Sequence, residues 1–314
     1  MTTTSRTFRI DREEGGIRLD LAVVRHLDIP WITRSRVQGW VEQGLVRVNG
    51  RPVKATRRLA PGDEVEIVLP PPPPKRELAP EEIPLSVVYE DEWLLALDKP
   101  PGLVVHPAQG NREGTLMHGL LWRAHSEGDT RRPHLVSRLD QGTSGLILVA
   151  KAPEVHAALQ REGMEKDYLA VVYGRTDLPK GRIDLGILRD PSDPRRRMAS
   201  RTEGRPSTTL WERLDESELS LLRCRLLTGR THQIRVHLQA ARMPLVGDPL
   251  YGAPGWKGIG DPALAEICRD FPRQALHAWR LGLIHPVTGE PLEIRAPVPP
   301  DLADLLSRAL LTFL

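Results

Sequence analysis

The sequence is poor in cysteine and contains no long run of apolar residues. Its 314 residues include two cysteines, Cys224 and Cys268, without the cysteine and histidine spacing of a zinc site. No apolar run approaches the ~20 residues that cross a bilayer, and the amino terminus lacks the apolar core of a secretory signal. We therefore expect no metal site, no membrane segment and a cytoplasmic location.

A glycine-rich, phosphate-binding loop is also missing, so nothing in the sequence indicates a bound cofactor. Hydrophobic residues make up 40% and charged residues 27% of the chain, as in an ordinary soluble globular protein. The net charge of +3 is too small to identify a nucleic-acid partner by itself. The distribution of the charges along the chain is more informative.

The residue pattern divides the chain into four parts. Residues 1–16 are polar and are predicted to be a flexible N-terminus. Residues 17–69 predict a small domain with helices over 18–25 and 33–42, an Asn49-Gly50 hairpin turn, and a turn with a closing strand over 59–68. The run of prolines within residues 70–82 cannot join a sheet and predicts a semi-rigid linker. Residues 83–314 are predicted to form the large second domain.

Positive charge is concentrated in the small domain. Between Thr33 and Arg58 there are seven basic residues against one acid, Glu42. The basic residues are Arg34, Arg36, Arg47, Arg51, Lys54, Arg57 and Arg58. Such a surface suits a phosphate backbone, whose contacts position a protein without reading sequence. A basic face that is only solvated is the alternative.

In the large domain, the predicted strands outnumber the helices and do not alternate with them as in βαβ units. This pattern predicts an α+β fold with a largely antiparallel sheet. The arginine-rich segment over 182–205, which contains several prolines, predicts a loop excursion. That loop would either help to grip RNA or be merely solvated.

The segment HLVSRLDQGTSGLILVAK at residues 134–151 is the centre of the interpretation. Two apolar runs flank a polar loop that holds Arg138 and Asp140, and Gly142 and Gly145 lie between the runs. The pattern predicts strand, loop and strand, with a guanidinium and a carboxylate on the loop. Taken alone, an arginine two residues before an aspartate more often ties a turn together than performs chemistry.

Four further blocks change this interpretation. They are KPPGLVVHP at 99–107, DYLA at 167–170, TGRTHQIRVH at 228–237 and PLVGDPLYG at 244–252. With the central segment, and in this order, they resemble the RluA/RluD-type RNA pseudouridine synthases. The small domain resembles the α-L RNA-binding domain first seen in a ribosomal small-subunit protein. The resemblance implies a pseudouridine synthase fold with a central mixed, largely antiparallel sheet.

The resemblance also implies roles for individual residues. Asp140 would be the carboxylate that acts at the sugar or the base, Arg235 its cationic partner, and Tyr168 the aromatic residue that stacks on uracil. Arg138 would fill the space that the extruded base leaves. The further RNA contacts that we expect near the site are Arg230 and His232.

The implied function is the isomerisation of specific uridines to pseudouridine in structured RNA. The expected partner is large-subunit ribosomal RNA or a ribosome precursor, and the protein is expected to be a monomer. The N1–C1′ bond breaks and C5 joins C1′ without oxidation, so no redox cofactor or metal is needed. The alternatives are a non-catalytic ribosome-assembly factor, which the presence of Asp140, Tyr168 and Arg235 together disfavours, and a nucleoside hydrolase, for which a calcium-binding aspartate cluster is missing. Ser137 stands where the family commonly has histidine, which bears on how the base or a phosphate is held.

Overall fold

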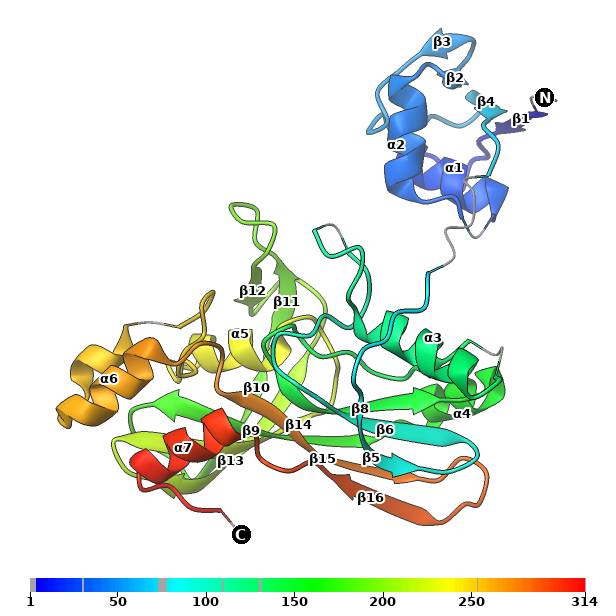
Figure 1. Cartoon of the computed structure of the whole chain (residues 1–314). Coiled ribbons are helices and arrows are strands. Elements are labelled where there is room, and N and C mark those ends of the chain that lie inside the picture. The colour runs from blue at the N-terminus through cyan, green and yellow to red at the C-terminus, as the bar shows by residue number, and fades with distance from the viewer. Residues whose placement is uncertain are drawn as a thin grey trace. The chain divides into compact units, whose positions relative to one another are not determined.

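A computed structural model gives the fold and describes residues 4–29, 31–72, 78–108, 110–129, 132–252 and 254–313. The chain divides into two compact units, Met1–Glu77 and Leu78–Leu314, which are traced in Figure 1. The division falls within the predicted linker over 70–82, of which residues 73–77 lie outside the described residues. Each unit has a hydrophobic core of its own.

The first unit packs two helices against a four-stranded antiparallel sheet. The helices are α1 (Leu19–Leu27) and α2 (Arg34–Glu42). The sheet has the order β1-β4-β2-β3, with β1 at Thr4–Arg9, β2 at Val46–Val48, β3 at Arg51–Pro52 and β4 at Glu64–Leu69. Asn49 and Gly50 have φ angles of 51° and 72°, the left-handed conformations that a tight hairpin turn between β2 and β3 requires. The predicted hairpin is therefore present.

The prediction of a flexible segment over residues 1–16 is wrong for residues 4–10, and its first three residues lie outside the described ones. Strand β1 pairs with β4 from Thr4↔Leu69 to Arg9↔Glu64, and Ile10 is buried in the core of the unit. The backbone groups on the open side of β4 need hydrogen-bond partners, and β1 supplies them. Within residues 4–10, Phe8 and Ile10 are the two residues that contribute apolar contacts, which is too few for a recognisable strand pattern.

The second unit is built on a ten-stranded mixed sheet. Its main path has the order β10-β13-β14-β9-β15-β8-β6-β5, while β7 pairs with β8 and β16 with β15. All the strand pairs are antiparallel except β15 with β8, so the predicted mixed, largely antiparallel sheet is confirmed. The bounds are β5 Ser86–Glu90, β6 Leu94–Lys99, β7 His134–Leu135, β8 Ser144–Ala150, β9 Glu165–Tyr173, β10 Lys180–Asp184, β13 Thr208–Glu216, β14 Leu219–Leu226, β15 Leu276–Ile284 and β16 Pro291–Arg295.

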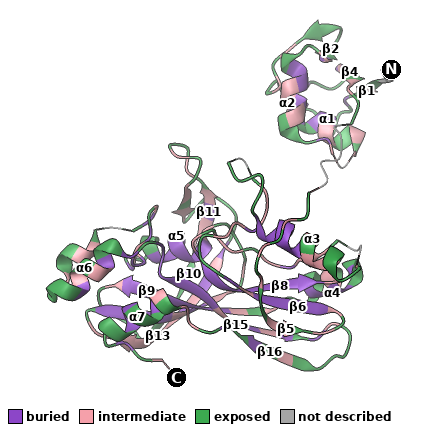
Figure 2. Ribbon diagram, viewed as in Figure 1, coloured by how far each residue is buried: buried purple, intermediate pink, exposed green. Residues whose placement is uncertain are grey.

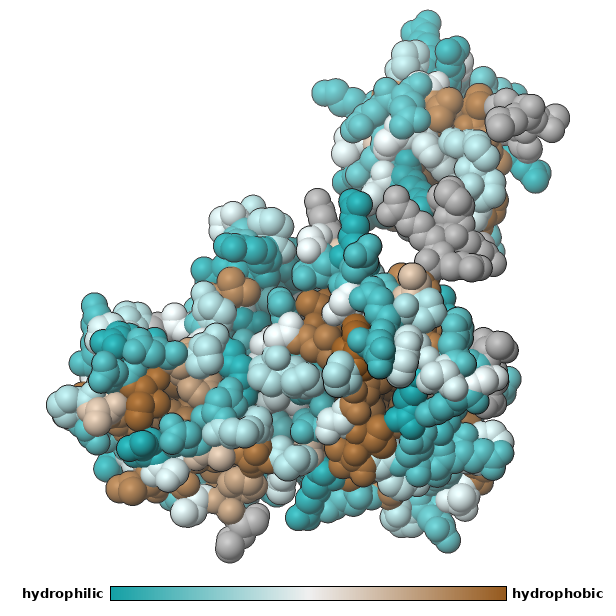
Figure 3. All heavy atoms as spheres, in the orientation of Figure 1, coloured by the Kyte–Doolittle hydropathy of each residue, from teal (hydrophilic) through white to brown (hydrophobic). Residues whose placement is uncertain are grey.

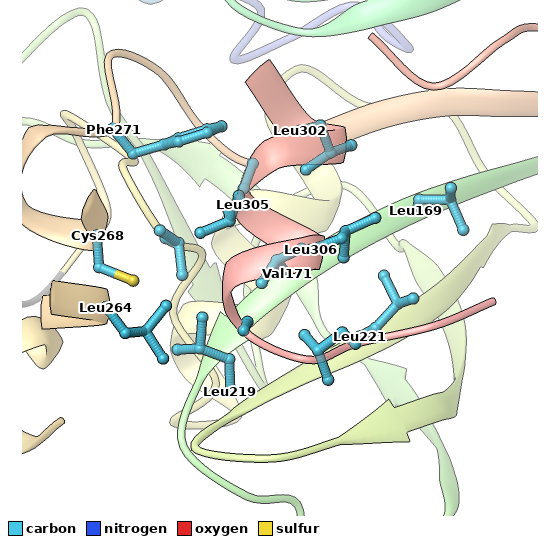
Figure 4. Packing of buried hydrophobic residues seen from close by; sticks show 14 residues of the cluster. Leu169, Val171, Leu219, Leu221, Leu264, Cys268, Phe271, Leu302, Leu305 and Leu306 are labelled. Carbon is cyan, nitrogen blue, oxygen red and sulfur yellow. The ribbon is translucent and has the colours of Figure 1, made fainter. Parts of the chain in front are cut away.

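Helices cover both faces of this sheet, which is why its central strands are drawn as buried in Figure 2. The helices are α3 (Leu116–Ser126), α4 (Pro153–Glu162), α5 (Gln233–Ala240), α6 (Pro262–Asp270) and α7 (Pro300–Arg308), with a short 3₁₀ turn at Gly255–Gly258. Helix α5 packs on the face of β9 that carries Tyr168, and α6 and α7 pack on the opposite face. Figure 4 shows the second contact, in which Leu302, Leu305 and Leu306 of α7 meet Leu169 and Val171 of β9.

The segment over 182–205, predicted as a loop excursion, contains more regular structure than expected. It begins in β10, and strands β11 (Gly186–Arg189) and β12 (Arg197–Ser200) pair antiparallel from Gly186↔Ser200 to Arg189↔Arg197. These strands are four residues long and bury Ile187 as their one core side chain. In strands this short, surrounded by prolines and arginines, the alternation of apolar and polar residues is too brief to be recognised in the sequence. Hydrophilic residues cover the excursion in Figure 3.

Candidate active site

A buried lysine, Lys99, fixes the loop between β7 and β8, which carries Arg138 and Asp140. The Lys99 ammonium donates hydrogen bonds to the carbonyl oxygens of Pro100, Leu103 and Gln141, the last of which directly follows Asp140. Burial lowers the pKa of Lys99 to about 7. Gly145 follows the loop with a φ of +104°, and a Cβ there would lie 2.2 Å from the Ala278 carbonyl oxygen. A glycine is thus required where β8 meets its parallel neighbour β15.

Asp140 meets a cation that is fixed from the other side. Arg235, in the first turn of α5, donates from Nη1 to Asp140 Oδ2 at 2.9 Å. The resemblance places these two residues together, and they do form an ion pair. The Arg235 side chain is only 5% exposed and the Asp140 side chain 21%, so the carboxylate is held by a buried donor while one side stays accessible.

Asp248 completes this arrangement, although we did not predict a role for it. Its fully buried carboxylate accepts hydrogen bonds from Arg235 Nε at 2.7 Å and Nη2 at 2.8 Å. The backbone N–H groups of Leu250 and Tyr251 donate to the same carboxylate. Burial alone would raise the pKa of Asp248, but the hydrogen bonds and charge of Arg235 outweigh it and hold the pKa below its ordinary value. Arg235 therefore bridges one buried and one accessible carboxylate.

The accessible side of Asp140 opens into a cavity of about 770 Å³, a volume typical of small-molecule sites. Its apolar walls include Val105, Leu139, Leu226, Ile234 and Leu276. Its polar lining includes Arg138, Asp140, Tyr168, Arg230 and His232, so the cavity brings the predicted residues of the large domain together. An apolar wall beside a carboxylate limits the access of water to a reaction intermediate.

Tyr168 lies on β9, facing the cavity, and is 7% exposed. Burial, with the charge of Asp140, raises the pKa of its phenol. The phenol is therefore neutral at physiological pH and offers a ring face and one proton rather than a phenolate base.

Lys166 was not predicted as a site residue. It lies two residues before Tyr168, on the same face of β9, and lines the same cavity. Burial lowers its pKa, and among the described residues no hydrogen bond or ion pair of its ammonium is found. The signal for it was available in the sequence, because alternate residues of a strand share a face.

Arg138 and Arg230 are exposed at the cavity and have no side-chain ion pair within the described part of the chain. Their guanidinium groups are free to meet an anionic ligand. Ser137 and His106 also line this cavity. Burial, and the charge of Arg138, lower the pKa of His106, so its imidazole is neutral at physiological pH. The rim of the cavity is thus cationic without the contribution of a protonated histidine.

His232 connects Asp140 to a second aromatic residue. Its Nε2 lies 3.9 Å from Asp140 Oδ2, and its Nδ1 lies 2.8 Å from the Tyr251 hydroxyl. Burial is the main cause that lowers the pKa of His232. The side chain of Gln233 accepts a hydrogen bond from the Arg230 backbone N–H and donates to the Thr208 carbonyl, which fixes the loop before α5.

The basic residues of the small domain divide into two groups. Four of them make contacts within the chain: Arg34 with Asp20 at 3.1 Å, Arg57 with Asp63 at 3.5 Å, Arg58 with the Gly16 carbonyl at 2.9 Å, and Arg36 over the Trp31 ring. Three are exposed and have no ion pair or side-chain hydrogen bond among the described residues, namely Arg47, Arg51 and Lys54. The second group is the one available to a ligand.

Within the described ranges, no cluster of three or more His, Cys, Asp or Glu side chains could hold a metal ion. No helix in the same ranges is long and apolar enough to cross a membrane.

Comparison with known proteins agrees with this geometry. The chain matches the family model described as RNA pseudouridylate synthase over residues 93–240, and the S4 domain model over residues 17–65. It is 42% identical over 303 residues to a protein of Xanthomonas campestris pv. campestris named ribosomal large subunit pseudouridine synthase D, covering 93% of this chain and 88% of that protein. It is also 42% identical over 284 residues to a Bacillus subtilis protein named uncharacterized RNA pseudouridine synthase YlyB, covering 87% and 88% of the two chains.

Among solved structures, human RNA pseudouridylate synthase domain containing 4 aligns with a TM-score of 0.58 and 24% identity. The alignment covers 73% of this chain and 94% of the human chain. At this identity the likeness concerns the fold.

Proposed function

This chain belongs to the RNA pseudouridylate synthase family and is an RNA pseudouridine synthase with an S4 domain, and we propose that it isomerises uridines of large-subunit ribosomal RNA. Several relatives that cover most of the chain carry that substrate in their names. The exposed Arg47, Arg51 and Lys54 of the S4 domain support an RNA ligand, because unpaired cations suit a phosphate backbone.

In the proposed mechanism the target uridine leaves its stack and enters the cavity beside Asp140. Arg138, which is exposed and has no ion pair among the described residues, takes the space that the base vacates. Arg235 holds the Asp140 carboxylate toward the sugar–base junction, where the N1–C1′ bond breaks. Tyr168 presents its ring to uracil while the base turns. C5 then bonds to C1′, the C5 proton leaves to solvent, and the freed N1 takes up a proton from solvent, so the product is an isomer of the substrate.

The observation that carries this proposal is the 2.9 Å contact between Arg235 and Asp140 at the wall of the cavity. A carboxylate in this position is oriented before the substrate arrives, and such preorganisation lowers the barrier of the chemical step. The apolar wall formed by Ile234 and Leu276 keeps water from the separated sugar and base, and thereby favours isomerisation over hydrolysis.

The test measures tritium released from C5 of labelled uridine in RNA. The protein is incubated with large-subunit ribosomal RNA transcripts and, separately, with transfer RNA transcripts. We expect release from ribosomal RNA by the wild type and by Asp304→Asn, a control at an exposed carboxylate on α7. We expect background release by Asp140→Asn.

Release from transfer RNA alone would contradict the proposed substrate. Release that persists in Asp140→Asn would remove Asp140 from its role. Mapping the uridines that lose modification in a strain without the gene then identifies the target positions.

We also propose that the protein acts as a monomer in the cytoplasm. The cavity and its polar lining come from one chain, which supports a site that needs no second copy. Sedimentation analysis of the active protein tests the first point, since activity confined to a dimer would contradict it. Cell fractionation tests the second.

A further inference from the structure

Tyr251 is a buried aromatic residue that the proposed mechanism does not use. It is 2% exposed and follows Asp248 in the loop after α5. Its backbone N–H donates to Asp248 Oδ1 at 3.0 Å. The backbone of Tyr251 is thus fixed by the same carboxylate that fixes Arg235, and this restricts where the Tyr251 ring can lie.

The Tyr251 hydroxyl joins two separate parts of the domain. It accepts a hydrogen bond from the backbone N–H of Arg197, the first residue of β12, at 2.7 Å. It also lies 2.8 Å from His232 Nδ1. Since the oxygen accepts from this backbone N–H, its own proton is available to His232 Nδ1. In that tautomer the imidazole proton is on Nε2, the nitrogen that faces Asp140 at 3.9 Å.

The ring of Tyr251 also lies against two guanidinium groups. Arg235 Cζ is 5.0 Å and Arg196 Cζ 5.5 Å from the ring centroid, which is within the range of a cation–π contact. Arg235 is the residue that holds Asp140. Arg196 belongs to the turn of the β11–β12 hairpin, and its buried Nε has no hydrogen-bond partner among the described residues. The same ring therefore touches the active site and the hairpin.

We propose that Tyr251 is a positioning residue that ties the β11–β12 hairpin to the Asp140–Arg235 pair, so that the hairpin must be seated on Tyr251 for Asp140 to be held in its reactive direction. This inference rests on the proposed function. It goes beyond it by assigning a residue outside the reacting groups and by making the hairpin part of the active-site support.

The charge of the hairpin explains why such a link is useful. Arg189, Arg201 and Arg205 of this excursion are exposed and have no ion pair in the described part of the chain. Phosphate groups bound by these arginines would hold the hairpin in place beside α5, which β12 contacts and which carries Arg235. Binding of RNA and alignment of the carboxylate then support each other, and the link requires no movement of the sheet.

The experiment compares Tyr251→Phe with Tyr173→Phe. The first keeps the ring and removes the hydroxyl that holds Arg197 and His232. The second removes the hydroxyl of another largely buried tyrosine, which donates to the Cys268 carbonyl at 3.3 Å and does not line the cavity. We expect Tyr251→Phe to lower kcat by about 10- to 100-fold, the cost of a small misplacement of reacting groups, with KM for RNA changed by less than about twofold.

Two further readouts separate positioning from general damage. The Arg197 amide should exchange its hydrogen faster in Tyr251→Phe than in the wild type, and Tyr173→Phe should change neither this rate nor kcat. His232→Ala combined with Tyr251→Phe should be no slower than the slower single variant, because both act through one chain of contacts.

A kcat of Tyr251→Phe equal to that of the wild type, an equal loss in Tyr173→Phe, a rise in KM alone, or fully multiplicative losses in the double variant would each overturn the proposal. The proposed function fails differently, since in that case the wild type itself releases no tritium from ribosomal RNA.

Discussion

Replacing Asp248 by asparagine tests whether a buried second carboxylate holds the catalytic ion pair. Asp248 Oδ1 accepts three hydrogen bonds, from Arg235 Nη2 and from the backbone N–H groups of Leu250 and Tyr251, and the asparagine oxygen can accept the same three. The asparagine amide then faces Arg235 Nε, which donates to Oδ2 at 2.7 Å in the wild type. Two donors would meet, and a buried guanidinium would lose half of its balancing charge.

The magnitude follows from these contacts. A hydrogen bond to a charged group contributes about 1.5–3 kcal/mol, and breaking a buried ion pair by removing one partner costs about 3–5 kcal/mol. Asp140 remains beside Arg235, so the charge is not left without any partner. We therefore expect a loss near the lower end of this range, about 3 kcal/mol in the free energy of unfolding, which lowers the melting temperature of a domain of this size by about 6–12 °C.

Thermal unfolding and single-turnover tritium release measure the two consequences together. Below the lowered melting temperature, the single-turnover rate constant should fall by about 100-fold, because Arg235 no longer has a fixed direction from which to hold Asp140. Asp304→Asn is the control, since its exposed pair with Arg308 at 3.6 Å should change the unfolding free energy by less than about 0.5 kcal/mol. If Asp248→Asn melts within 2 °C of the wild type, or folds normally and reacts at the wild-type rate, the reasoning about the bridge is refuted.

Three further predictions concern RNA binding and pH. Replacing Arg47 and Arg51 by glutamine should weaken RNA binding and reduce the slope of log Kd against log salt by about 1–2, with kcat at saturating RNA unchanged; an unchanged slope would contradict a phosphate contact. If the Lys166 ammonium binds a phosphate of the RNA, Lys166→Met should raise KM for RNA and reduce that slope by about 1. Lys180→Met, on the exposed end of β10, is the control. A fall in kcat alone would contradict the phosphate contact. Burial lowers the pKa of His277 from 6.5 to about 4. As the pH falls, the imidazole of the unfolded state therefore takes up a proton before that of the folded state does. The free energy of unfolding should fall by up to about 3 kcal/mol as the pH drops from 6.5 to 4. His277→Asn should flatten this dependence, which chemical denaturation at several pH values measures.

The positions of the main strands along the chain and the central loop could be predicted because each is a local pattern. The apolar run of β8 and the turn residues before it place Asp140 between two strands, and the Asn49-Gly50 turn identifies the hairpin of the S4 domain. Thr33 also accepts a hydrogen bond from the Arg36 N–H, as the predicted start of α2 requires. These features depend on residues within a few positions of one another.

The missed features depend on contacts between distant residues. Strand β1 exists because β4, more than fifty residues away, leaves backbone groups to be paired. Arg273 donates both to Asp301 and to the Gly142 carbonyl, and thereby ties the catalytic loop to α7. None of these pairings is visible from the sequence around either partner.

The distribution of ion pairs explains how a chain with a net charge of +3 can present a cationic surface to RNA. The buried carboxylates of Asp20 and Asp248 are paired with arginines of the same chain, so their negative charge is balanced within the fold. The exposed Arg47, Arg51, Arg138 and Arg230 have no acid partner within the described ranges. The potential at a surface depends on the charges that remain unpaired there, rather than on the sum over the chain. The net charge therefore underestimates the affinity of this protein for a polyanion. The slope of log Kd against log salt should depend on the number of unpaired arginines and lysines that contact phosphates.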